Sequence, residues 1–356
     1  MRFVKIDKKL FAGGLERLQT SYRMFGPVKE NNFYDFQAID KGETPDLTML
    51  NTRLSPKSII YPQSELMFEY SLDESKQDSH ILKEIEPDNS PRVVIGMRPC
   101  DAKAFLLVQH NFATLEYKDP YWVKAYESTT LVGLACNTPC STCFCTTAGS
   151  GPFHEAGLDV LLVDTGDYYL AKLLTPKGEN LLKLAGWEEE VGSDNANQEI
   201  ENLKQTVEAR ILTRVNTDKL REKKTTDLFD APFWEEFAFS CINCGTCTYV
   251  CPTCWCFDIQ DEVSKTTGVR MRNWDSCMYP LFTHHGSGHN PRDTKTKRLR
   301  QRFMHKLKYY VDKYEKGIQC VGCGRCIRFC PVNIDIRKIC EAMNDFEPVQ
   351  KYISDI

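Results

Sequence analysis

The chain has 356 residues, of which 26% are charged and 42% are hydrophobic. This composition excludes a disordered chain, and the length is enough for about two domains. The net charge is −4, so the chain as a whole has no basic field for nucleic acid or an anionic membrane. No apolar run reaches the ~18–20 residues of a membrane span, and the N-terminus lacks the apolar stretch of a secretory signal. We therefore expect a cytoplasmic protein that neither spans a membrane nor binds nucleic acid.

Residues 1–235 alternate between strand-like and helix-like segments. Such an alternation favours an α/β domain with a mostly parallel sheet. In chain order we expect a helix at Lys8–Tyr22, strands at Phe33–Ile39, Ser58–Tyr61 and Arg92–Ile95, a helix at Asp101–Gln109, strands at Thr129–Leu134, Asp159–Val163 and Tyr168–Leu174, and a helix at Gly178–Leu184.

The remainder of the chain reads as helical. Residues 187–230 are polar and predict a bridging helix between domains, and Asp227–Phe239 and 293–316 predict further helices. We therefore expect an N-terminal mixed α/β domain at 1–235 and a C-terminal α-helical ferredoxin domain at 236–356.

Cysteine is the unusual feature of the composition, with 17 residues. An odd number of cysteines in a large chain without an export signal indicates metal binding or redox work rather than disulfides. Two stretches share the spacing C-x2-C-x2-C-x3-C-P, which is the ligand run of bacterial [4Fe–4S] ferredoxins. The two stretches are Cys241-Cys244-Cys247-Cys251-Pro252 and Cys320-Cys323-Cys326-Cys330-Pro331.

In such runs the first three cysteines hold one cluster, and the fourth faces away and serves the other cluster. We therefore predict two [4Fe–4S] clusters. The ligands of the first are Cys241, Cys244, Cys247 and Cys330, and those of the second are Cys251, Cys320, Cys323 and Cys326. A zinc site would leave the third cysteine of each run unexplained.

Five earlier cysteines follow two predicted strands. Cys100 comes after Arg92–Ile95, and the others come after Thr129–Leu134. If the two strands are parallel, both loops lie at the same edge of the sheet and the cysteines converge. We favour a third [4Fe–4S] cluster held by Cys100, Cys136, Cys143 and Cys145, with Cys140 as an alternate ligand. A zinc site and merely structural or redox-labile thiols remain alternatives.

Other residues near these motifs have simpler interpretations. We interpret Cys254, Cys256, Cys277 and Cys340 as buried fillers. Asp101 is expected to cap a helix rather than to act as a catalytic acid. No acid–base or nucleophile constellation is evident.

The insert between the two runs is basic. Lysine and arginine are frequent between Pro291 and Lys313. This pattern fits a solvated helix face, and it equally fits cations that stabilise reduced clusters or dock an acidic partner.

Several further motifs extend over nearly the whole chain. They are MRPCDAKAF (97–105), CSTCFCT (140–146) followed by GSGP, CPTCWCF (251–257), RNWDSC (272–277), SGHNPR (287–292) and RQRFMHKLKYY (300–310). With the two ferredoxin runs, they resemble the family that contains the A subunit of anaerobic sulfite reductase and the β subunit of sulfhydrogenase. That family also includes iron–sulfur subunits of heterodisulfide-reductase-linked NAD(P)H oxidoreductases.

The resemblance implies an electron-transfer subunit of a soluble anaerobic oxidoreductase complex. Its partners would be a flavin/NAD(P)H-binding subunit, or a ferredoxin, and a hydrogenase, sulfite reductase or heterodisulfide reductase. FAD or FMN would bind the partner subunit rather than this chain. The alternative is a self-contained reductase of sulfur compounds that uses a cluster of the N-terminal domain.

Overall fold

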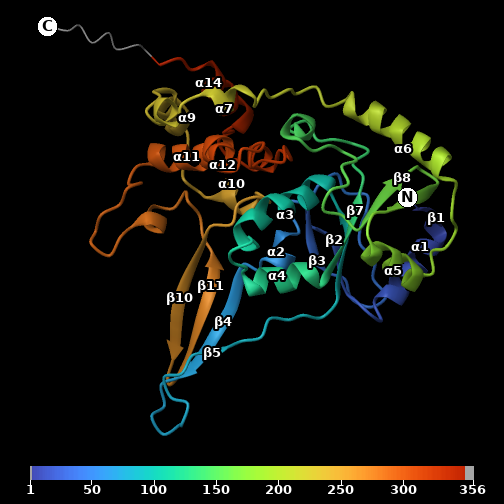
Figure 1. The fold of residues 1–356 in the computed structure, drawn as a ribbon, viewed down its shortest axis with the longest axis horizontal. Coiled ribbons are helices and arrows are strands. Elements are labelled where there is room, and N and C mark those ends of the chain that lie inside the picture. The colour runs from blue at the N-terminus through green and yellow to red at the C-terminus, as the bar shows by residue number, and fades with distance from the viewer. Residues whose placement is uncertain (1, 349–356) are drawn as a thin grey trace.

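The computed structural model describes residues 2–348, which form two sheets and a helical region (Figure 1). The larger sheet has seven strands in the order β1-β9-β8-β7-β6-β2-β3. These strands are β1 (Arg2–Asp7), β2 (Arg23–Glu30), β3 (Phe33–Ala38), β6 (Arg92–Met97), β7 (Thr129–Leu134), β8 (Val160–Asp164) and β9 (Tyr168–Leu173). The central strands β2, β6, β7 and β8 are parallel, and the pairings β1–β9, β8–β9 and β2–β3 are antiparallel.

Helices cover both faces of this sheet. Helices α1 (Lys8–Leu18) and α5 (Pro176–Ala185) pack on one face, and α3 (Pro99–Phe112), α4 (Pro120–Glu127) and α6 (Ser193–Glu208) pack on the other. Successive residues of a strand point to opposite faces. Val93 and Val94 of β6 accordingly belong to different hydrophobic cores.

A second sheet forms an arm that extends away from the rest of the chain (Figure 1). Its four strands have the order β10-β11-β4-β5. They are β4 (Ser64–Ser71), β5 (Lys83–Glu84), β10 (Phe257–Ser264) and β11 (Thr267–Trp274). Because β11 pairs with β4, segments that lie about 200 residues apart in the sequence share this sheet.

The C-terminal region is mainly helical. Its helices are α7 (Lys219–Glu222), α8 (Thr225–Phe229), α9 (Phe233–Phe239), α10 (Thr246–Tyr249), α11 (Lys295–Met304), α12 (Tyr310–Tyr314), α13 (Arg325–Arg328) and α14 (Ile336–Asp345). Helices α11 and α12 are joined by a π-helical turn at His305–Tyr309. The predicted fold class, an α/β part followed by a helical ferredoxin part, is confirmed.

The structure differs from the expected elements at several places. It adds the unpredicted strands β1, β2, β4, β5, β10 and β11, and the large sheet is mixed rather than mostly parallel, because three of its six pairings are antiparallel. Ser58–Tyr61, expected as a strand, lies largely in the short helix α2 (Lys57–Ile60), where buried Ile59 and Ile60 lack the in–out alternation of a strand. The helix expected at Asp227–Phe239 is divided into α8 and α9 around Pro232, which has no N–H for a continuous helix. The bridging segment 187–230 contains α6 together with shorter helices rather than one long helix.

Among the described residues, no helix is both long enough and apolar enough to cross a bilayer.

Candidate metal centres

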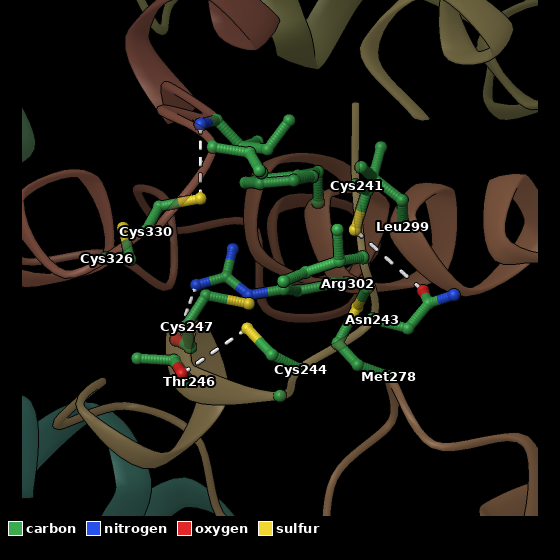
Figure 2. Close-up of a pocket in the computed structure, with 15 residues that line it drawn as sticks. Cys241, Asn243, Cys244, Thr246, Cys247, Met278, Leu299, Arg302, Cys326 and Cys330 are labelled. Carbon is green, nitrogen blue, oxygen red and sulfur yellow. Dashed lines mark hydrogen bonds between the residues drawn. The ribbon is translucent and has the colours of Figure 1, made fainter. Parts of the chain in front are cut away.

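The first ferredoxin run encloses a small cavity together with two cysteines of the second run, Cys326 and Cys330. Cys241, Cys244 and Cys247 lie on the loop leading into α10 and on α10 itself, and Cys330 lies just after α13. Figure 2 shows the sulfur atoms of these four cysteines around one space, with Cys326 next to Cys330. The N–H of Ile334 donates to Cys330 Sγ at 3.2 Å. The fold thus brings the fourth cysteine of the second run to the first run.

A buried cation reaches into this cavity. Arg302 is 2% exposed, and its Nη2 donates to the carbonyl oxygen of Cys247 at 2.8 Å. Its Nε and Nη1 have no hydrogen-bond partner among the described residues. Buried donors without acceptors are unfavourable, and an anionic iron–sulfur cluster bound here would supply acceptors for them. The residues around the cavity therefore fit a [4Fe–4S] cluster.

The second group consists of Cys251, Cys320, Cys323 and Cys326. The charge of Cys251 raises the pKa of Cys320 and of Cys326, so these thiols lie close together. Burial raises the pKa of the Cys320 thiol to about 12, with a further contribution from Cys251. Thiolates at this site therefore need positive charge nearby, either iron or a basic side chain.

Lys306 places such a charge beside the second group. It is 3% exposed, and its Nζ donates to Thr253 Oγ1 at 2.8 Å. That hydroxyl lies 3.3 Å from Cys251 Sγ. Burial opposes the charge of Lys306, but the neighbouring Cys251 and Cys254 raise its pKa.

The five early cysteines also converge. Cys100 lies at the start of α3 and Cys136 follows β7. Strands β6 and β7 are parallel, as the prediction required, so both cysteines lie at the same edge of the sheet. The charge of Cys136 acts on Cys145, and that of Cys145 acts on Cys100.

Cys140 and Cys143 complete this third group. Their thiols are hydrogen bonded to each other, and Arg328 Nη1 lies 3.2 Å from Cys140 Sγ. The Cys143 thiol and Arg328 lower the pKa of Cys140 to about 6. The buried hydroxyl of Thr142 has no partner among the described residues, so its hydrogen is available to a bound group. Five thiols therefore surround a site at which a [4Fe–4S] cluster needs four.

The third group lies directly against the second ferredoxin run. The N–H of Phe144 donates to the carbonyl oxygen of Gly322 at 2.9 Å. A Cβ on Gly322 would lie 2.6 Å from the backbone of Cys145, and one on Gly324 would lie 2.3 Å from Thr142 Oγ1. The two glycines thus allow the loop that carries the early cysteines to reach the ferredoxin run.

A buried ion pair joins the α/β part to the second ferredoxin run at this contact. Arg325 Nη1 and Nη2 donate to Asp101 at 2.5 and 2.8 Å, and the side chains are 0% and 1% exposed, respectively. The expectation that Asp101 caps α3 is wrong, because Arg98 holds the N-cap position and Asp101 lies in the first turn. The carboxylate pairs with Arg325 rather than with backbone N–H groups.

Within residues 2–348, no three His, Cys, Asp or Glu side chains are grouped to hold a single metal ion. A zinc ion needs its thiolates about 2.3 Å from one point, whereas each thiolate of a [4Fe–4S] cluster binds a different iron. The described residues thus give the zinc alternative no support.

The comparisons with known proteins concern the ferredoxin region and the chain as a whole. Residues 240–334 match the family described as a 4Fe-4S dicluster domain. The chain is 30% identical over 351 residues to sulfhydrogenase 2 subunit beta of Pyrococcus furiosus, covering 97% of this chain and 99% of that protein. The chain belongs to the sulfhydrogenase β-subunit family. No solved structure matches it.

In this member of the sulfhydrogenase β-subunit family, the basic insert contains buried cations that the sequence analysis did not single out. Arg298, Arg302 and Lys306 recur every four residues along one helix face, and all three are buried. Side chains that are four residues apart lie on the same side of a helix. That spacing was the available signal, and it argues against a solvated face for these three residues.

Proposed function

We propose that this chain is an electron-relay subunit of a sulfhydrogenase-like complex. The single observation that carries the proposal is the contact of three cysteine groups within one fold. The first group combines three cysteines of the first run with Cys330 of the second run. The third group packs against the second run at Gly322. Iron–sulfur clusters bound there would accept and donate single electrons.

The protein's own residues would hold the clusters, exclude water and balance charge. We propose Cys241, Cys244, Cys247 and Cys330 for one [4Fe–4S] cluster and Cys251, Cys320, Cys323 and Cys326 for a second. For a third we propose Cys100, Cys136, Cys143 and Cys145, with Cys140 as the alternate ligand. Arg302 and Lys306 provide positive charge beside the first two sites, where they favour the reduced, more anionic state.

One end of this series reaches the surface. Cys244 is exposed, and Ile242 and Phe239 next to it are 61% and 83% exposed. Exposed apolar side chains beside a redox centre suit the approach of a partner. We propose that a redox partner docks over Cys244 and that the third group serves the opposite end of the relay.

The proposed partners follow from the family. One is a flavin/NAD(P)H-binding subunit, which would carry FAD or FMN, or a ferredoxin. The other is a hydrogenase, sulfite reductase or heterodisulfide reductase subunit. We propose a cytoplasmic, anaerobic setting because thiol-rich clusters need a reducing compartment.

The domain division that we propose is 1–235 and 236–356. The pairing of β4 with β11 adds a connection between the two parts, since these strands belong to different domains in this division. The arm would then hold the domains together beside the cysteine groups.

The test is to purify the native complex without oxygen and identify the chains that accompany this one. A flavin/NAD(P) subunit together with a hydrogenase, sulfite reductase or heterodisulfide reductase supports the relay and names the acceptor. Three clusters predict about twelve irons in this chain, and two predict about eight. A chain that purifies alone with its clusters intact contradicts the relay.

A second candidate function is a self-contained reductase of sulfur compounds. The observation that favours it is the crowding of the third group, where Cys140 is left over if the other four cysteines bind a cluster. The purified chain would then reduce sulfite, polysulfide or a disulfide with reduced viologen and no other subunit. Turnover that requires partner subunits excludes this candidate.

A further inference from the structure

The spacing C-x2-C-x-C occurs twice in the chain. The first copy is Cys140–Cys145 in the third group, and the second is Cys251–Cys256, where the last cysteine of the first ferredoxin run continues into two more cysteines. In both copies the first two thiols are hydrogen bonded to each other. The second copy therefore repeats a local arrangement that surrounds a proposed cluster.

A further cysteine joins the second copy from the other strand of the arm. Cys256 precedes β10, and Cys277 follows β11. The two ends are held together because the N–H of Asp275 donates to the carbonyl oxygen of Cys256 at 2.9 Å. The thiols of Cys256 and Cys277 are hydrogen bonded to each other, and Cys254 is close enough to influence Cys277. Three thiols thus meet at the base of the arm.

A buried lysine faces these thiols without a carboxylate. Lys57 is 5% exposed, and its Nζ donates to the carbonyl oxygens of Cys254 at 2.9 Å and Cys251 at 3.3 Å. The same Nζ lies 3.7 Å from the ring centre of Trp274. Among the ion pairs of the described residues, none involves Lys57. A buried ammonium needs an anion nearby.

We infer that Cys254, Cys256 and Cys277 hold a further [4Fe–4S] cluster, with Lys57 as its counter-cation. Cys251 remains a ligand of the second ferredoxin group. Three cysteines leave one iron of this cluster without a cysteine ligand, so that position is open to a small ligand such as a thiolate or sulfide.

The charge of Lys57 favours a cluster over the simpler interpretations, although Cys251 of the second group also lies beside it. Filler thiols are neutral, and so is a disulfide between Cys256 and Cys277, and neither provides an anion for the ammonium. Thiolates bound to an iron–sulfur cluster provide it. The inference adds a site to the relay and does not require the third group to hold a cluster.

The test compares Cys256→Ser and Cys277→Ser with Cys340→Ser in the full chain, purified without oxygen. Cys340 is a suitable control because it is also buried, and its thiol bonds to the carbonyl oxygen of Asn216 at 3.4 Å, away from the arm. Each arm variant should lose about four irons and four sulfides, and the control should lose none. Unchanged iron in the arm variants overturns the inference.

The iron that remains separates this inference from the relay. About eight irons or more in the arm variants show that the ferredoxin clusters are intact. Wild-type protein without iron would instead contradict the relay itself.

A second measurement applies if the cysteine variants do not fold. Lys57→Met removes the counter-cation and keeps the ligands, and Lys308→Met is its control, because Lys308 is equally buried but pairs with Asp312. In an EPR-monitored redox titration, Lys57→Met should shift one cluster to a lower potential, and Lys308→Met should shift none. If no signal shifts, or if the shifted signal is the one that Cys320→Ser removes, the inference is wrong.

Discussion

The side chain of Arg302 extends from helix α11 into the cavity of the first cysteine group. Two of its nitrogens are buried without partners among the described residues, and the third is bonded to the carbonyl oxygen of Cys247. On another side of the same helix, the half-buried Arg300 has its Cζ 3.5 Å from the ring centre of Phe229. The two arginines have the same charge, but only Arg302 reaches the cavity.

Replacing Arg302 with Met should make the first cluster harder to reduce. Loss of one nearby charge removes about 1–2 kcal/mol of attraction at an effective dielectric constant of ~20, which corresponds to a fall of roughly 50–100 mV. An EPR-monitored redox titration measures the potential. Arg300→Met should leave it unchanged, and equal shifts in both variants would contradict a specific role for Arg302.

The exchange of fourth cysteines gives a separate prediction for Cys330. Cys330→Ala should perturb the cluster of the first run, because Cys330 lies in the same cavity as Cys241, Cys244 and Cys247. EPR spectra of the variant should change for that cluster and keep the signal of the second. A change in the second cluster alone would show that the ligands are not exchanged.

At the scale of elements, the decisive contact is between the loop of early cysteines and the second ferredoxin run. Gly324 has a φ of +72°, and its missing Cβ leaves room for Thr142. Neither segment contributes an extensive secondary-structure element to this contact, which depends on backbone approaching backbone.

The variant Gly324→Ala should separate these two segments. The new Cβ would lie 2.3 Å from Thr142 Oγ1 and 2.6 Å from the Thr142 carbonyl oxygen. We expect a loss of roughly 1–3 kcal/mol of stability, together with loss of iron from the third group. Thermal unfolding and iron analysis provide the measurements.

Gly42→Ala is the matched control for this variant. Gly42 has a φ of +88° but no atom within 4 Å of the added Cβ. It should therefore show only backbone strain, about 1–2 kcal/mol, and keep all of its iron. Equal iron loss in both variants would contradict the steric argument.

The buried pair Asp101–Arg325 joins the α/β part to the ferredoxin part. Asp101→Asn leaves the guanidinium buried without its counter-charge, which should cost about 3–5 kcal/mol. Denaturant unfolding measures this loss. Glu190→Gln, in the exposed pair with Arg2, should cost less than about 1 kcal/mol. Similar losses in the two variants would show that the buried pair does not hold the parts together.

At the scale of the whole molecule, cysteines of both ferredoxin runs pack against the C-terminal hydrophobic core. Cys241, Cys247, Cys320 and Cys326 pack against that core, whereas the two cores of the seven-stranded sheet contain none of these four. We therefore expect bound iron to stabilise the C-terminal helical part more than it stabilises the seven-stranded sheet.

Removal of iron by a chelator should unfold the C-terminal part first. Burial raises the pKa of Cys320 and of Cys145 to about 12, so both thiols are protonated at neutral pH without iron. Rebinding of iron must release those protons, and it should strengthen as the pH rises toward 12. Calorimetry should show a new low-temperature transition after chelation. A single unshifted transition would contradict this coupling.

The local chemistry could be predicted from consecutive residues. Ligand spacing in the two ferredoxin runs is a property of consecutive residues, and buried strands such as β6 and β7 appear as short apolar runs, so both could be predicted. The parallel pairing of those strands was enough to predict that Cys100 and Cys136 converge.

Contacts between distant segments, by contrast, became visible in the fold. Arg302 and Lys306 became buried charges, Asp101 found Arg325, and Cys277 reached Cys256 through the pairing of the arm strands. Pairing across long separations depends on packing and charge compensation rather than on local propensity. The spacing of cysteines therefore predicted ligands within each run, and the fold alone showed which cations and which further cysteines stand beside them.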